Sequence, residues 1–143
     1  MSQVKDCFEK GLLKKTSKSK TLALQDLEQS EFFLNEGFDL IELKKKEMSL
    51  IALYNSAFHA ARAILYKDGV KEKSHYCLQK YLEEKYLNKG LNDEELSLFD
   101  KLKGIRQEVQ YNVTKVEIEE DMDELYNQTE EFIEKIKKLI KTS

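Results

Sequence analysis

The apolar residues of this chain recur every three or four positions, the spacing that places them on one face of an α-helix. The clearest example spans residues 48–67, with an apolar stripe of Ile51, Tyr54, Phe58, Ala61 and Leu65. The segment 117–141 keeps the same spacing at Ile118, Met122, Leu125, Thr129, Phe132, Ile136 and Leu139. No segment shows the sustained alternation of a β-strand. The pattern predicts an all-α protein.

Weaker forms of the pattern predict further helices. We expect a short helix at 3–13, a basic joint at 14–20 and a helix at 22–36 with Leu24, Leu27, Leu34 and Phe38 on its apolar side. Gly37 is expected to break or kink that helix. Residues 38–47 are expected to form either a short helix or its continuation. A later helix has the stripe Leu98, Leu102, Ile105 and Val109.

Capping residues mark several helix ends. Gly69 can adopt the left-handed conformation that ends the helix at 48–67, and residues 70–73 are then expected to form a loop. Ser74 is a suitable N-cap for the next helix. Asn92 followed by Glu95 has the spacing of a capping box.

Composition agrees with long helices and short joints. The 143 residues include no proline and five glycines, which argues against turn-dense β folds. We expect residues 1–143 to form one domain, an up-and-down bundle of four to six helices. No apolar run approaches the ~20 residues that cross a bilayer, and residues 1–14 lack a signal-peptide core. We therefore expect a cytoplasmic protein that does not bind membranes.

Charge directs attention to a few rare side chains. The formal net charge of −3 excludes a polybasic nucleic-acid coat, so any contact with RNA must be local. Among 24 basic residues only Arg62 and Arg106 are arginines, and His59 and His75 are the two histidines. Codon bias explains why arginine is rare, but arginine binds planar anions as lysine cannot.

Several kinds of site are absent from the sequence. Cys7 and Cys77 form no CxxC pair and are expected to be buried, reduced thiols. The cysteines and histidines are too scattered for a standard metal site, and no phosphate loop, dinucleotide fingerprint or nucleophile elbow occurs. We therefore expect no metal and no cofactor.

A polar stripe lies beside the apolar stripe of the helix at 48–67. Its members Asn55, His59, Arg62 and Tyr66 follow one another by four, three and four positions. Two interpretations stay open. The stripe either forms hydrogen bonds to neighbouring helices at the edge of the core, or it lines a groove next to a second site.

The second site is centred on Arg106. It lies about 40° around its helix from Leu102, at the edge of the buried stripe, where a guanidinium needs a phosphate or carboxylate partner. Gly104 in the same helix costs ~1 kcal/mol relative to alanine. Close approach of another backbone or a ligand would explain it, as would drift or a local kink.

These residues resemble the pattern of small prokaryotic HEPN-domain proteins, YxxxFHAARALL followed by KSH and LRxxxDY. The chain carries YNSAFHAARAIL from Tyr54, KSH at 73–75 and RQEVQY from Arg106. Gln110 stands where the pattern usually has aspartate, and the segment from 37 to 54 is several residues longer.

The resemblance implies a homodimeric helical bundle. Many HEPN proteins are metal-independent ribonucleases with an R-x4–6-H motif, often paired with a small nucleotidyltransferase antitoxin. Arg106 matches the motif arginine, which would hold the scissile phosphate. Tyr111 replaces the motif histidine, and an ordinary tyrosine pKa of ~10 makes a poor base. His59 or His75 would serve instead only within about 3 Å of the nucleophile.

The resemblance also gives Tyr111 another role. In related toxin pairs the partner enzyme transfers AMP to a motif tyrosine, and Tyr111 resembles that acceptor. Alternatively, its ring packs against the end of the helix.

Two functional hypotheses follow. The first is a HEPN-type protein that binds RNA or a nucleotide phosphate within a toxin–antitoxin-like pair with a minimal nucleotidyltransferase. Its nucleotide-binding residues would be His59, Arg62, His75 and Arg106, converging near one groove, and its candidate catalytic residues Arg106 and Tyr111. The alternative is a catalytically silent interaction module in which Arg106 forms a salt bridge inside the bundle.

Overall fold

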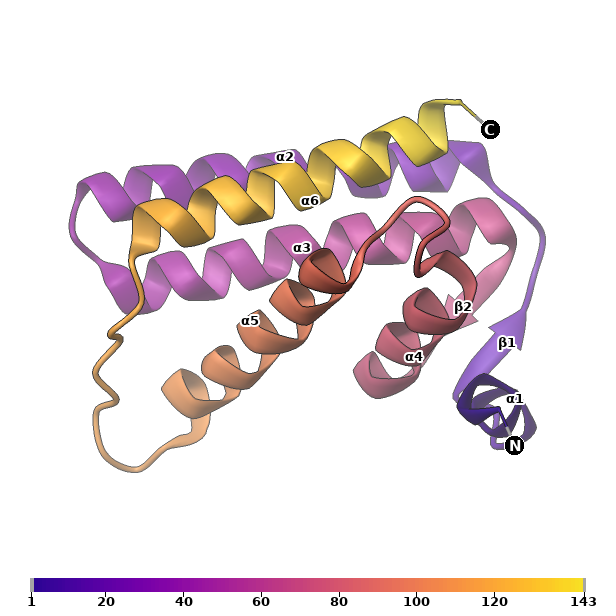
Figure 1. Ribbon diagram of the computed structural model, residues 1–143, viewed down its shortest axis with the longest axis horizontal. Helices are drawn as coiled ribbons and strands as arrows, with labels where there is room; N and C mark the ends of the chain where they lie inside the picture. Colours follow the sequence, from indigo (N-terminus) through magenta and orange to yellow (C-terminus); the bar gives the residue numbers. More distant parts are fainter. Residues whose placement is uncertain (1, 143) are drawn as a thin grey trace.

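The computed structural model describes residues 2–142 and shows a helical bundle with one small β-ribbon (Figure 1). Its elements are α1 (Gln3–Glu9), β1 (Leu13–Lys15), α2 (Lys20–Glu42), α3 (Lys46–Asp68), β2 (Val70–Glu72), α4 (His75–Tyr86), α5 (Asp93–Tyr111) and α6 (Met122–Lys141). The long helices α2, α3 and α6 pack side by side, while α5 contacts the other side of α3. The predicted all-α bundle is confirmed.

The central helix is α3, which contacts α2, α4, α5, α6 and β2. Five of its residues are fully or almost fully buried alanines: Ala52, Ala57, Ala60, Ala61 and Ala63. Small side chains let neighbouring helices approach closely. At the contact with α2, Ser30 Oγ donates to the Ser56 carbonyl and Ser56 Oγ donates to the Ser30 carbonyl, each at 2.7 Å.

Gly37 does not break α2, contrary to the sequence prediction. The helix runs without interruption from Lys20 to Glu42. A Cβ at position 37 would lie 2.8 Å from Leu53 Cδ2, and the Gly37 carbonyl accepts a hydrogen bond from Ser49 Oγ. Glycine therefore permits the close approach of α3, and the local sequence gives no sign of that tertiary reason.

Other boundaries also differ from the prediction. The first helix is shorter than expected, α2 begins earlier, and the last helix begins at Met122 after the N-cap Asp121. Leu24 and Phe38, expected on the apolar face of α2, are 36% and 45% exposed. The caps at Gly69, Ser74 and Asn92 are confirmed, with Gly69 at φ 79°. No helix within residues 2–142 is long and apolar enough to cross a membrane.

Two segments predicted as a joint and a loop form an antiparallel ribbon. Lys14 of β1 lies opposite Lys71 of β2, Leu13 opposite Glu72, and Lys15 opposite Val70. The strands have three residues each, too few to show alternation in the sequence. The ribbon closes the open end of the α2–α3 hairpin, so a tertiary contact creates it rather than strand propensity.

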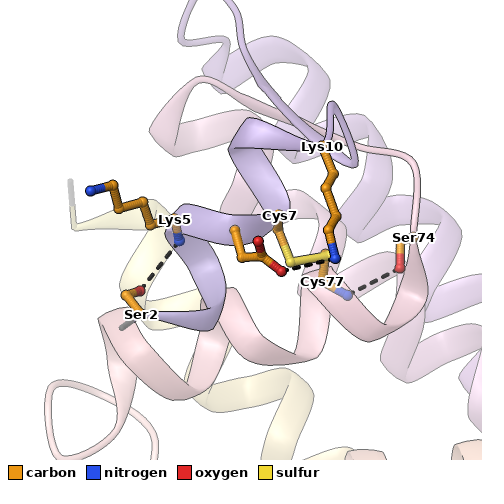
Figure 2. Close-up of a disulfide and its surroundings, with 7 residues drawn as sticks. Ser2, Lys5, Cys7, Lys10, Ser74 and Cys77 are labelled. Carbon is orange, nitrogen blue, oxygen red and sulfur yellow. Dashed lines mark hydrogen bonds and ion pairs between the residues drawn. A yellow bond between two sulfur atoms is a disulfide. The ribbon is translucent and has the colours of Figure 1, made fainter.

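Cys7 and Cys77 form a disulfide between α1 and α4, so the prediction of reduced thiols is wrong (Figure 2). The fold places their Cα atoms 5.9 Å apart, a spacing that a disulfide bridges. Ser74 caps α4 beside the bond, and its hydroxyl accepts from the Cys77 backbone N–H (Figure 2). The cysteines are 70 residues apart in the sequence, and only the docking of α1 on α4 brings them together.

Candidate functional site

The polar stripe of α3 meets a carboxylate on α2. Nε of Arg62 donates to Asp26 Oδ2 at 2.7 Å, and a terminal nitrogen of Arg62 donates to Asp26 Oδ1 at 2.9 Å. Nδ1 of His59 lies 2.7 Å from the same Oδ1. Two members of the stripe, His59 and Arg62, therefore form hydrogen bonds to a neighbouring helix, as the first of the two open interpretations expected.

Asp26 is ionised and its charge is balanced within this cluster. Burial raises the pKa of its carboxyl, but hydrogen bonds and charge from His59 and Arg62 outweigh burial and lower the pKa. The Asp26 side chain is only 4% exposed. A buried carboxylate with two cationic or polar partners is a satisfied structural group, and it occupies the N–H edge of the Arg62 guanidinium that would otherwise bind another anion.

A row of aromatic rings joins this cluster to α4. The Phe58 ring stacks on His75 with centroids 4.4 Å apart, and Cζ of Arg62 lies 5.3 Å from the centroid of Phe58. Beyond Phe58, the Tyr54 hydroxyl and Nδ1 of His75 share a hydrogen bond of 2.6 Å. His75 is the first residue of α4, so the Ser74 cap fixes the point at which its ring enters the row.

Arg106 covers the other end of the row without an acidic partner. Its Cζ lies 4.8 Å from the centroid of Tyr54. Its Nε is buried and has no hydrogen-bond partner, and no ion pair to Arg106 forms within residues 2–142. The salt bridge that the silent-module hypothesis required is therefore not present in the described chain. Arg106 as a whole is half-buried, so part of its side chain is accessible to solvent.

The groups beside Arg106 are held in their neutral forms. Burial, followed by the positive charges of Arg106, Lys103 and Arg62, lowers the pKa of His75. Burial raises the pKa of Tyr54 to about 12. A neutral imidazole can accept a proton, so His75 meets the protonation requirement for a general base near neutral pH. The neutral Tyr54 hydroxyl holds the His75 ring in place through their shared hydrogen bond.

The structure thus places the four rare side chains in two connected groups. His59 and Arg62 contact Asp26, His75 and Arg106 border Tyr54, and the Phe58 ring connects the groups. Whether these residues bind a nucleotide stays a prediction. The geometry nevertheless distinguishes the two arginines, because only Arg62 is paired with a carboxylate, that of Asp26.

Tyr111 lies apart from both groups at the end of α5. Its side chain is 71% exposed, so the alternative in which its ring packs against the helix end is wrong. No hydrogen bond or ring contact joins Tyr111 to Arg106 in the part of the chain that the structure describes. At Gly104, for which close approach and drift were both open explanations, a Cβ would meet nothing within 4 Å among the described residues. It allows no close approach within the chain.

Sequence reasoning missed Asp26, Tyr54 and Phe58 as parts of the site. Asp26 carried a usable signal, because it shares a face of α2 with buried Ala23, Leu27, Ser30 and Leu34. A carboxylate at such a position requires a cationic partner. The spacing of Tyr54 and Phe58 predicts that both pack in the apolar core, and nothing in it distinguishes a packed ring from one that supports an imidazole.

An open depression of about 800 Å³ lies between α2 and α3 beside the Asp26 cluster. Asp26 and the exposed side chains of Leu22 and Phe32 line it from α2, and Arg62 and Tyr66 line it from α3. Arg62, the cation that lines it, is already paired with Asp26, so the depression supplies no free positive charge. Across residues 2–142 no group of three or more His, Cys, Asp or Glu side chains could hold a metal ion.

Comparison with known proteins bears out the resemblance noted in the sequence. A search of curated proteins found no match for the chain. The family model of the HEPN domain matches residues 24–139, which include α3, α4, α5 and nearly all of α2 and α6. The match therefore covers most of the bundle and every residue of the two connected groups. The chain belongs to the HEPN domain family.

Proposed function

We propose that this protein binds RNA or a nucleotide phosphate through Arg106. Membership of the HEPN family suggests a function related to RNA or nucleotides. The observation that carries the proposal is the contrast between the two arginines. Arg62 is neutralised by Asp26, whereas the half-buried Arg106 has an Nε without a hydrogen-bond partner and forms no ion pair within residues 2–142. A phosphate is a natural bidentate partner for such a guanidinium.

The same arrangement supports a metal-independent ribonuclease. Arg106 would stabilise the charge that develops on the scissile phosphate. His75 would take the proton of the ribose 2′-hydroxyl, whose oxygen then bonds to phosphorus to give a 2′,3′-cyclic phosphate. The bond from phosphorus to the 5′-oxygen of the next nucleotide breaks, and that oxygen takes a proton from water. His75 rather than Tyr111 suits the role of base, because it shares the Tyr54 ring with Arg106 and has a lowered pKa.

Replacing Arg106 with alanine is expected to weaken binding of AMP and of single-stranded RNA roughly 10- to 100-fold, because a charge-assisted hydrogen bond is lost. Any RNA cleavage in the presence of EDTA should disappear as well. Arg106→Lys should bind with intermediate affinity, because lysine keeps the charge but not the planar fork. Calorimetry and cleavage of a labelled oligonucleotide measure both effects.

Lys101→Ala provides the matched control, since Lys101 is an exposed cation on the same helix. Its affinity should remain that of the parent protein. Unchanged affinity in a folded Arg106→Ala variant would refute the proposed binding role, and cleavage that survives this substitution would exclude the proposed ribonuclease mechanism.

We further propose a toxin–antitoxin-like pair with a minimal nucleotidyltransferase that modifies Tyr111. Exposure of Tyr111 supports this, because an acceptor must reach the active site of another enzyme. In the transfer, the Tyr111 oxygen bonds to the α-phosphorus of ATP, pyrophosphate leaves, and the phenolic proton passes to a base. Homodimerisation is part of the proposal on the strength of the resemblance alone.

Co-expression with a nucleotidyltransferase encoded beside the gene should increase the mass of the protein by one adenylate. Tyr111→Phe should abolish the increase, while Tyr76→Phe should not, although Tyr76 is also an exposed tyrosine. Intact-protein mass spectrometry measures the change. Adduct formation on the Tyr111→Phe variant would contradict the assignment.

The proposed cytoplasmic location has one observation against it. Disulfides persist in oxidising compartments and are uncommon in the cytosol, where thiol systems reduce them. The Cys7–Cys77 bond thus requires either an oxidising environment or protection by burial, and both sulfur-bearing residues are at most 3% exposed.

A further inference from the structure

The ribbon gathers lysines that no acidic side chain neutralises. These residues, which we call the basic ribbon, are exposed and lie on or next to β1 and β2: Lys14, Lys15, Lys18, Lys71 and Lys73. None of them forms an ion pair with a residue between 2 and 142, whereas Lys10 at the C-cap of α1 and Lys67 of α3 do. In a protein with a net charge of −3, this is a strong local concentration of positive charge.

The crowding works against folding. Lys14 and Lys71 are directly opposite in the antiparallel register, where like charges destabilise a sheet. Lys73 lies beside them, and contact with Lys14, together with the charges of Lys14 and Lys71, lowers the pKa of Lys73. The one acidic residue of the ribbon, Glu72, is half-buried, and its charge acts on Arg62 and Tyr54 of α3. Stability therefore does not explain these lysines, but attraction of an anionic partner does.

Positive charge continues from the basic ribbon to the candidate site. Lys73 is followed by the cap Ser74 and then by His75, which contacts Tyr54 beneath Arg106. On the other side, Lys103 precedes Arg106 by three residues on α5, and its charge also acts on His75. A chain of phosphates could thus meet cations from β1 as far as α5.

An exposed aromatic side chain favours single-stranded RNA as the occupant. Tyr76, next to His75, is 49% exposed, and Nζ of Lys80 lies 5.4 Å from the centroid of its ring. Basic grooves with accessible aromatic rings suit single-stranded nucleic acids, because lysines track the backbone while bases stack on the rings.

We propose that the basic ribbon is a docking surface that leads the phosphate backbone of single-stranded RNA to Arg106. The inference rests on the proposed function, since Arg106 supplies the destination. It adds a second binding region, formed partly by β1, which lies outside the segment that matches the family.

The test replaces Lys14, Lys71 and Lys73 with glutamine in one variant. Its probe is a fluorescent oligouridylate of about 16 nucleotides, titrated at several salt concentrations. For a single strand, each lost phosphate contact reduces the slope of log K against log salt by about 0.7, so the slope should fall by about 2. Affinity at low salt should fall roughly ten-fold or more. Thermal stability should stay the same or rise, because repulsion is relieved.

A matched control replaces Lys44, Lys45 and Lys46 with glutamine. This triplet lies at the opposite end of the 23-residue α3, about 35 Å from the ribbon, and the substitution changes the net charge equally. The control should keep the parent slope. AMP binding, which needs Arg106 but not the ribbon, should be the same in both variants and the parent.

The outcomes separate this inference from the proposed function. If the protein binds the oligouridylate through Arg106 but the ribbon variant keeps the parent slope, docking on the ribbon is wrong and the proposed function stands. Equal losses in the ribbon variant and the control would also overturn it, because the effect would then reflect net charge. If the parent protein binds no RNA, both proposals of RNA binding fail.

Discussion

Replacing Asp26 with alanine is expected to lower the free energy of unfolding by roughly 3 kcal/mol, with a fall in melting temperature of about 10 °C. The reason is that Arg62 and His59 would keep their partly buried positions without their shared carboxylate. Arg62 is 30% exposed, which places the effect at the lower end of the range for a broken buried ion pair. Chemical denaturation followed by circular dichroism measures it.

Two further variants make this prediction specific. Asp39→Asn removes an exposed carboxylate from the same helix and should change stability by less than about 0.5 kcal/mol. The Asp26→Ala, Arg62→Ala double variant should lose less than the sum of its two single variants, because the second change removes an unpaired cation. Strict additivity would show that the two residues do not stabilise one another.

The Asp26 effect also has a pH dependence of defined sign. Its folded pKa is lowered, so its contribution is fully present above the unfolded carboxyl pKa of about 3.9 and is lost as the pH falls through the folded pKa. The stability difference between the parent protein and Asp26→Asn should therefore shrink at acidic pH. A difference that grows on acidification would contradict this assignment of charge.

Reduction of the Cys7–Cys77 disulfide is expected to lower the free energy of unfolding by about 4 kcal/mol, because the closed loop spans 70 residues. Within the native state, α1 should lose protection first. It contacts mainly α4 and β1, and a hydrogen bond from Ser2, its N-cap, to Glu84 also links it to α4. Melting curves with and without dithiothreitol, together with hydrogen exchange of residues 3–9, measure the two effects.

The Cys7→Ser, Cys77→Ser variant is the control for reagent effects. It should melt at the temperature of the reduced parent protein and should not respond to dithiothreitol. Titratable thiols in the folded, unreduced parent protein would refute the disulfide directly. Hydrogen exchange that rises equally in α1 and α3 would show that the bond supports the whole bundle rather than α1.

The helices that the sequence predicted well are those whose signals are local. The stripe on α3 and the caps at Gly69, Ser74 and Asn92 depend on residues within one or two turns, and the structure confirms them. The features that failed depend on distant partners. Gly37 faces Leu53, Cys7 meets Cys77, and β1 exists because β2 lies beside it. Spacing along one segment contains no information about such contacts.

The candidate site divides in the same way. The sequence singled out Arg106 because its helical position predicted a half-buried cation, and that position is what the structure shows. It did not show that Asp26 would pair with Arg62 while Arg106 would have no carboxylate partner, since Asp26 is 36 residues from Arg62. Only the tertiary contact between Asp26 and Arg62 distinguishes the structural arginine, Arg62, from the available one, Arg106.

The β1–β2 ribbon has a consequence for the order of folding. The segment that separates its strands is the α2–α3 hairpin itself, so the strands can meet only after the hairpin has brought its two ends together. Closing that long loop without the helices would cost conformational entropy that three-residue strands could not recover. The lysines of β1 and β2 therefore become neighbours late, and their joint surface exists only on a chain whose helical hairpin is already closed.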